Sequence, residues 1–148
     1  MLRFACCKWL LEPLLELGID RNKIDVCDIG KKYNYGYFKI VPIKLFHDVE
    51  NAGWRIFYKN YKAIYCTDTC TLEGIKAIDY DFYLIEGNYE NEEELKSYAK
   101  DSIYFDRVKG THLSREYARN WLLDNMGLKS VYEFMHKHKY KEISDEEY

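Results

Sequence analysis

The sequence lacks any long apolar run. No stretch approaches the roughly 18 consecutive apolar residues that a membrane-spanning helix needs. The apolar start, MLRFACCKWLLEPLLEL, is interrupted by charges and a proline, unlike a secretory signal. These features predict a cytoplasmic protein. No internal repeat and no low-complexity linker divides the 148 residues, so we expect a single domain over residues 1–148 with an acidic tail at about 140–148.

An excess of positive charge is also absent. The formal net charge is −3, so the chain does not carry the general electrostatic footprint of a nucleic-acid-binding protein. A basic strip on one face would still allow a nucleic acid or nucleotide to bind, but the overall charge does not support such a partner.

The cysteines do not form the pattern of a disulfide framework. There are five, which is an odd number, and two of them are adjacent. This arrangement predicts reduced thiols in a reducing compartment. Cys66 and Cys70 have a spacing that zinc sites use, but no second ligand pair of similar spacing completes a structural site.

The residues that are present supply a core and a series of short strands. Hydrophobic residues make up 47% of the chain and aromatic residues 17%, enough apolar surface for one domain to fold. Apolar positions at helical spacing predict a helix over residues 5–17 that ends at Gly18. Asn60 marks the turn of an expected hairpin. Runs rich in β-branched and aromatic residues predict strands over residues 37–45, 54–58, 63–67 and 81–86.

Two further helices and a last strand are expected in the second half. Residues 91–105 open with an acidic first turn. In the helix expected over residues 113–126, Ser114 is the N-cap. Residues 130–135 have the composition of a short strand. Strands followed by helices predict an α/β fold with a mixed sheet flanked by helices. Because nothing in the sequence terminates the sheet edge, we expect it to pair with a partner chain or a second copy.

All four histidines occupy informative positions. Each follows an apolar strand-like run or stands at a helix start, and Asp68 ends the run KAIYCTD. A single histidine of this kind is more often structural, but the set together with Asp68 favours a metal site. Neutral imidazole and carboxylate suit Zn²⁺ or Mn²⁺, and such an ion acidifies water for hydrolysis. His112, in GTHLS, could donate a hydrogen bond to a phosphate or merely neighbour the helix cap.

Several strings resemble one family in the correct order. FHDVENAGWRIFYKNYKAIYCTDT, DFYLIEGNY, GTHLSREYARNWL and VYEFMHKH resemble motifs of the metallo-β-lactamase superfamily. The resemblance is strongest to phage and bacterial members near the ribonuclease Z and phosphodiesterase branch. It covers residues 17–138 and implies a metal-dependent hydrolase of the phosphodiesterase or nuclease type.

The resemblance implies a role for individual residues. His47 resembles a terminal ligand of one metal, Asp68 the carboxylate that bridges two metals, and His136 a ligand of the second. His112 resembles the histidine that assists phosphodiester cleavage in the ribonuclease Z branch.

Three more residues match family motifs in less direct roles. Glu86 and Asn88 match a recurrent motif that is structural or that orients a metal-binding histidine, because a carboxylate beside such a histidine fixes its direction. His138 stands where the family has serine or histidine. We interpret Glu86 and Asn88 as supporting the site and His138 as a weaker candidate for it.

One departure from the family is large. The motif His-x-His-x-Asp-His, which members carry upstream of this region, occurs nowhere in the 148 residues. The resemblance therefore implies the C-terminal half of a metallo-β-lactamase αββα sandwich, a truncated domain. We expect at most one weakly held Zn or Mn ion without the missing half.

Three functions remain open at this point. The chain could be a hydrolase completed by another polypeptide or by a homodimer across the open sheet edge. It could be a non-catalytic binding module, such as a phage-type inhibitor of a host defence protein, with aromatic anchors such as Tyr33, Tyr35 or Trp54. It could also be an incomplete gene product that folds without function.

Overall fold

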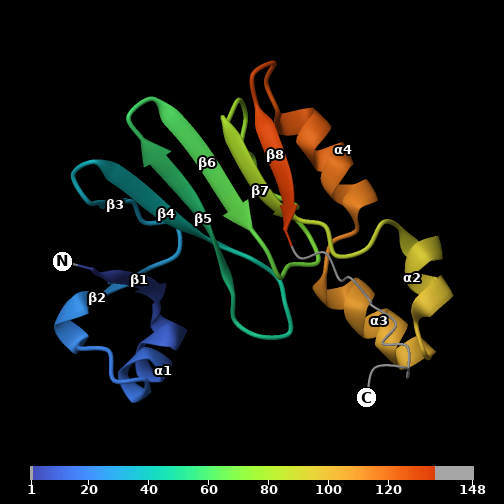
Figure 1. Ribbon diagram of the computed structural model, residues 1–148, viewed down its shortest axis with the longest axis horizontal. Coiled ribbons are helices and arrows are strands. Elements are labelled where there is room, and N and C mark those ends of the chain that lie inside the picture. Colours follow the sequence, from blue (N-terminus) through green and yellow to red (C-terminus); the bar gives the residue numbers. More distant parts are fainter. Residues whose placement is uncertain (1, 136–148) are drawn as a thin grey trace, which may run out of the picture.

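The computed structural model describes residues 2–135 and is drawn in Figure 1. A small N-terminal unit comes first. Strand β1 (Phe4–Cys7) pairs in parallel with β2 (Ile24–Cys27), and the connection holds the short turns η1 (Lys8–Leu10) and η2 (Arg21–Lys23) and helix α1 (Leu11–Glu16).

The predicted helix over residues 5–17 is wrong at its start. Cys6 and Cys7 lie in β1 and are buried, so their apolar side chains pack within a strand pair and not on a helix face. Helix α1 begins only at Leu11, which places Pro13 in the first turn, where a missing backbone N–H costs no hydrogen bond. Gly18 follows the helix with φ +80°, as the predicted helix end requires.

The main sheet contains six strands within residues 2–135. They are β3 (Tyr33–Asn34), β4 (Phe38–Lys44), β5 (Ala52–Tyr58), β6 (Tyr61–Cys66), β7 (Phe82–Glu86) and β8 (Val131–Met135), and their spatial order is the order of the sequence. β3 to β6 are antiparallel neighbours, whereas β6, β7 and β8 run parallel. The strands predicted from the sequence are confirmed. β3 and the N-terminal strand pair were not predicted.

The hairpin between β5 and β6 is confirmed. Tyr58 and Tyr61 are register partners, which leaves Lys59 and Asn60 as a two-residue turn. Asn60 lies in this turn, as predicted, and its neighbour Lys59 takes the left-handed conformation with φ 52°.

Three helices follow β7. They are α2 (Glu92–Tyr98), α3 (Ser102–Thr111) and α4 (Arg115–Asn125). The helix predicted over residues 91–105 is two helices, because the Asp101 side chain accepts the backbone N–H of Tyr104 at 2.7 Å and caps a new start. Ser114 caps α4 as predicted, accepting the N–H of Tyr117 at 3.1 Å.

Helix α4 covers one face of the main sheet and forms the core with it. Ala118 and Leu122 pack against Ile64, Tyr83 and Ile85, all of them buried. The hydroxyl of Tyr83 accepts the Tyr80 N–H at 3.0 Å and donates to the Ala77 carbonyl at 2.6 Å. The strand side chains that face α4 are therefore held in a rigid core, and Figure 1 shows α4 beside β7 and β8.

Two other expectations can be compared with the structure. None of the five cysteines is paired in a disulfide, and four of them are buried. Within residues 2–135, no helix has the length and apolar character needed to cross a membrane.

Candidate metal centre

Three strands end together at one edge of the main sheet. β4 and β6 both pair antiparallel with β5, so they run in the same direction, and β7 runs parallel to β6. His47 follows β4, Asp68 follows β6, and Glu86 is the last residue of β7. The fold thus brings these residues to one edge, where ligand sites in α/β sheets commonly form.

His47 lies in the loop after β4 with its side chain 13% exposed. Both of its ring nitrogens are buried and have no hydrogen-bond partner within residues 2–135. Nδ1 lies 2.6 Å from Oδ1 of Asp48, but this contact does not have hydrogen-bond geometry. Because buried polar atoms in native proteins are nearly always paired, the two unpaired nitrogens fit a histidine that binds a metal.

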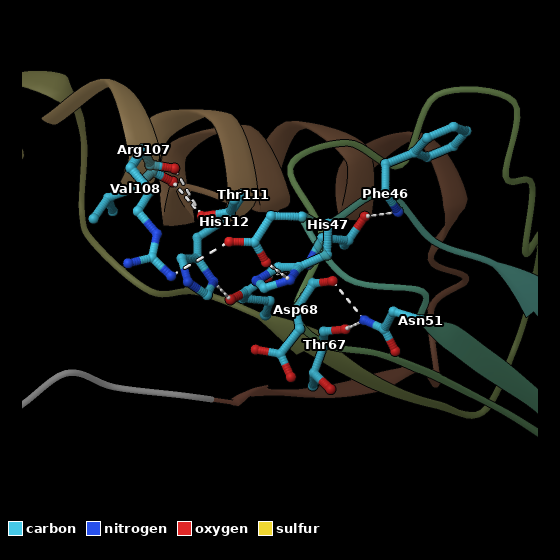
Figure 2. Close-up of polar contacts among 12 residues, drawn as sticks. Phe46, His47, Asn51, Thr67, Asp68, Arg107, Val108, Thr111 and His112 are labelled. Atoms are coloured by element: carbon cyan, nitrogen blue, oxygen red, sulfur yellow. Dashed lines mark hydrogen bonds and ion pairs between the residues drawn. The ribbon is translucent and has the colours of Figure 1, made fainter. Parts of the chain in front are cut away.

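Asp68 is held in a strained conformation. Its φ of 55° lies in the left-handed region, which costs free energy for a residue other than glycine. The Asn51 side chain holds the loop in place, since its Nδ2 donates to the Thr67 carbonyl at 2.9 Å and to the Asp68 carbonyl at 2.6 Å. Figure 2 shows Asn51 pointing at both carbonyls. Strain of this kind is frequent at functional sites.

Glu86 is fully buried and joins two parts of the site. Its Oε2 accepts the backbone N–H of Thr69 at 2.8 Å, and its Oε1 lies 2.5 Å from Nδ1 of His112. A buried carboxylate is stable only when it is paired in this way. The residue therefore ties the loop that carries Asp68 to His112.

His112 follows α3, and its backbone N–H donates to the Val108 carbonyl at 2.9 Å. The hydrogen bond with Glu86 raises the pKa of His112, and the charges of Glu86, Asp68 and Asp48 act in the same direction against the effect of burial. Because Nδ1 is engaged by Glu86, Nε2 is the ring nitrogen left for a metal or a substrate.

His47, Asp68 and His112 form one cluster. Their ligand atoms all lie within 4.8 Å of one another, and the two imidazole ring centroids are 5.1 Å apart. Figure 2 shows the cluster below α3. Ligand atoms around one tetrahedral zinc are roughly 3.4 Å apart, so a bound ion would draw the three side chains slightly together. Two imidazoles and a carboxylate fit Zn²⁺ or Mn²⁺.

The predicted residues can now be placed. His47 and Asp68 come together as expected, and His112, predicted as catalytic, lies with them. His136 and His138 lie outside the described residues. β8, which precedes them, ends at Met135 at the same edge of the sheet, where the Met135 carbonyl accepts the Gly87 N–H at 3.0 Å. The roles assigned to all of these residues stay predictions.

Glu86 and Asn88 take different positions. Glu86 contacts His112 directly, as an orienting carboxylate would. Asn88 is buried but is outside the cluster, and its backbone N–H donates to the Leu113 carbonyl at 3.0 Å. This backbone hydrogen bond holds Leu113, the residue that follows His112, in position.

Some residues of the site were missed by the sequence reasoning. Asn51 and Thr69 hold the Asp68 loop through hydrogen bonds to residues from other elements. Arg107 lies on α3, with Nη2 3.3 Å from Oδ2 of Asp48. The only signal for Asn51 was the general tendency of asparagine to bind backbone groups in loops.

Three cavities adjoin histidines of the cluster, and two of them are lined by His47. One of about 660 Å³ lies beside His47 and is lined by apolar side chains of both the N-terminal unit and the β4–β5 loop, including Trp9, Ile29, Phe46 and Val49. A recess of about 330 Å³ is bounded by His47, His112, Tyr104 and Arg107. These cavities bring open space up to His47 and His112, whereas the ring nitrogens of His47 are themselves buried.

Solved structures share this arrangement of strands and helices. The metallo-β-lactamase fold protein YhfI from Bacillus subtilis aligns with a TM-score of 0.59 and 15% identity, over 80% of this chain and 45% of that chain. Zn²⁺-bound PqqB from Methylobacterium extorquens aligns at 0.57 and 9% identity, over 74% and 45%. Human tRNase Z, short form, aligns at 0.51 and 13% identity, over 81% and 54%.

This chain has part of the metallo-β-lactamase fold. The predicted fold class, a mixed sheet flanked by helices that forms a portion of this fold, is confirmed. The chain spans about half the length of these three solved structures. No protein-family model matches the sequence, and no curated protein does.

Proposed function

We propose that this chain supplies part of the active site of a metal-dependent hydrolase that cleaves phosphodiesters. The observation that carries the proposal is the pair of buried ring nitrogens of His47, neither of which makes a hydrogen bond within residues 2–135, beside Asp68 and His112 within 4.8 Å. The likeness to tRNase Z supports a nuclease, and the likeness to zinc-bound PqqB supports zinc as the metal.

His47 and Asp68 would hold the ion, and His136, which follows β8, is the further ligand we propose. A bound Zn²⁺ or Mn²⁺ supplies an acidified water and positive charge at the scissile bond. Three protein ligands leave a position open for water, as catalytic zinc sites require.

His112 would act on the leaving group. Glu86 holds Nδ1, which fixes the ring and directs Nε2 away from the buried carboxylate. An imidazolium held in this way donates its Nε2 proton to the leaving oxygen of a phosphodiester. The hydrogen bond with the fully buried Glu86 raises the pKa of His112 and so favours the protonated ring.

The rest of the site would come from polypeptide outside these 148 residues. The chain covers 45% of YhfI and of PqqB, and His47, Asp68 and the proposed His136 are only three ligands where a two-metal site needs more. We therefore propose that full activity requires a complementing polypeptide.

Measuring the amount of metal bound by the chain tests the proposal directly. The chain is stripped with a chelator, reloaded with Zn²⁺ or Mn²⁺, desalted and analysed for bound metal. Asp68→Ala is compared with Asp79→Ala, a matched control because Asp79 is also left-handed, with φ 52°, but is exposed and is not part of the cluster. We expect about one ion per chain in the wild type and in the control, and at least a tenfold weaker affinity in Asp68→Ala.

His112→Ala separates the two roles of this histidine. Retained metal with lost phosphodiester cleavage supports the proton donor, whereas lost metal identifies a ligand. No bound metal in any of these proteins would contradict the proposal and favour the non-catalytic binding module, which should tolerate Asp68→Ala.

A further inference from the structure

The largest cavity beside the metal cluster has the size and lining of a small-molecule site. Ligand-binding cavities measure roughly 300–1,000 Å³ and are lined mainly by apolar and aromatic side chains. The cavity beside His47 measures about 660 Å³, and the rings of Trp9 and Phe46 are part of its lining. Phe46 is 44% exposed and Trp9 is half-buried, so a ligand can reach both rings.

Two parts of the chain that are distant in sequence form the walls of this cavity. Trp9 lies in η1 and Ile29 follows β2, both in the N-terminal unit. Phe46 and Val49 lie in the loop between β4 and β5. Gly110 of α3 also lines the cavity, and nothing within residues 2–135 beyond its own helix lies within 4 Å of a Cβ atom added there. The open space therefore extends to the backbone of α3.

The cavity is continuous with the metal cluster. It shares His47, Asp48 and Thr111 with the recess that His112 bounds. Figure 2 shows Phe46 and His112 on opposite sides of His47. A ligand in the cavity therefore reaches the cluster by way of His47. A nucleotide can do so, because a single sugar separates its base from its phosphate.

A nucleobase suits the lining of the cavity better than an aliphatic chain does. Every base has a π face that stacks on aromatic side chains, whatever the sequence. The Glu50 carboxylate lines the cavity and can accept an amino N–H of a base. Lys44 can donate to a base carbonyl or ring nitrogen, and its Nζ lies 5.6 Å from the centre of the Phe46 ring. An aliphatic chain would use neither charge.

The complementing polypeptide proposed above is the other candidate for this space. A stable protein interface buries about 800 Å² on each partner, over a broad surface. This cavity is instead a concave space between two parts of one chain, since Trp9 and Phe46 both belong to it. Its volume and enclosure fit a small molecule or one group of a larger substrate.

We propose that the cavity binds the nucleobase of a nucleotide substrate, stacked against Trp9 and Phe46. The choice of ligand rests on the proposed phosphodiester cleavage, and it narrows the substrate class to nucleotides or nucleic acids. The base lies on one side of His47 and the phosphate on the side of Asp68 and His112. Because stacking supplies the affinity, the site does not need the basic footprint that a net charge of −3 lacks.

NMR titration of the ¹⁵N-labelled 148-residue chain with adenosine, in EDTA, tests the proposal. Adenosine has a base but no phosphate, so its binding does not require metal. The ring current of the base should shift the indole N–H signal of Trp9. It should leave that of Trp121 in place, because this indole donates to the Ile75 carbonyl at 2.9 Å beside the core. We expect a dissociation constant of about 1 mM or lower, and no shift with ribose 5-phosphate, which lacks the base.

Two variants locate the binding. Phe46→Ala is compared with Phe82→Ala, because the two rings are 44% and 45% exposed but only Phe46 lines the cavity. Loss of one stacking ring should raise the dissociation constant for adenosine at least about fivefold in Phe46→Ala and leave it unchanged in the control. Gly110→Leu fills the cavity from α3 and replaces a helical glycine by a stronger helix former. Adenosine should then no longer shift the Trp9 signal.

The result is separable from the metal measurement. Adenosine binding by a chain that takes up no metal supports the nucleobase cavity and contradicts the proposed hydrolase. Metal uptake without adenosine binding does the reverse and leaves the cavity to the complementing polypeptide. Equal affinities in the wild type and in Phe46→Ala, or an equal loss in Phe82→Ala, overturn the proposal.

Discussion

Replacing Glu86 by glutamine perturbs the site without changing its shape. In the wild type, the carboxylate accepts the Thr69 N–H at 2.8 Å and faces Nδ1 of His112 at 2.5 Å. In Glu86→Gln, the amide oxygen can still accept the Thr69 N–H while the amide nitrogen donates to a neutral His112. When His112 is protonated, its Nδ1–H would point at the N–H of the glutamine amide. Two donors would then face each other with no acceptor between them.

The effect on the free energy of unfolding therefore depends on pH. The Glu86 hydrogen bond raises the pKa of His112 above its unfolded value of 6.5. The stabilisation is complete below about pH 6.5 and is lost as the pH rises through the folded-state pKa. Since a buried hydrogen bond to a charged group contributes about 1.5–3 kcal/mol, we expect Glu86→Gln to lose about 2 kcal/mol at pH 5.5 and under about 1 kcal/mol at pH 9.

Urea unfolding in EDTA measures this difference. With a slope of about 1.5 kcal/mol per molar urea, the midpoint of Glu86→Gln should fall by more than about 1 M at pH 5.5. Glu90→Gln is the control, because Glu90 makes an exposed ion pair with Arg119 and should change stability by less than about 1 kcal/mol. A loss for Glu86→Gln that is equal at both pH values, or larger at pH 9, would refute the reasoning.

Three further predictions follow from local geometry. Gly53→Ala should lower the free energy of unfolding by at least about 2 kcal/mol in urea titration, because the added Cβ would lie 2.6 Å from the backbone oxygen of Tyr65. Asn51→Ala should weaken Zn²⁺ affinity about tenfold in a competition titration, because it removes two hydrogen bonds to the loop after β6; unchanged affinity would contradict this. With iodoacetamide at pH 8, the half-buried Cys70 should be alkylated first. Cys66 should stay unmodified, because burial raises the pKa of its thiol to about 12. Peptide mass spectrometry identifies which cysteine is alkylated.

Local patterns predicted much of the fold. The strands of the β5–β6 hairpin, the covered strand β7 and helix α4 with its Ser114 cap all follow from short-range composition and periodicity. Two errors also have a local explanation. Residues 5–7 share their apolar spacing with a helix, and Asp101 begins a second helix inside a segment with continuous helical composition.

The missed elements depend on contacts between distant residues. β1 pairs in parallel with β2, so that Cys7 lies opposite Cys27, and no periodicity in either segment indicates which other segment it pairs with. Parallel pairing needs a long crossover, and short-range composition does not encode it. Asn51 likewise became part of the site only through its bonds to residues 16 and 17 positions later.

The sequence by itself determined the chemistry available at the site. It supplied histidines and a carboxylate at the ends of apolar strands, and the order of the motifs indicated the fold. The tertiary structure decided how these groups meet. It placed His112 within 4.8 Å of His47 and Asp68, buried Glu86 against its ring, and left the His47 nitrogens unpaired. Burial and pairing are properties of the packed sheet and helices, because each depends on side chains that lie far apart in the chain.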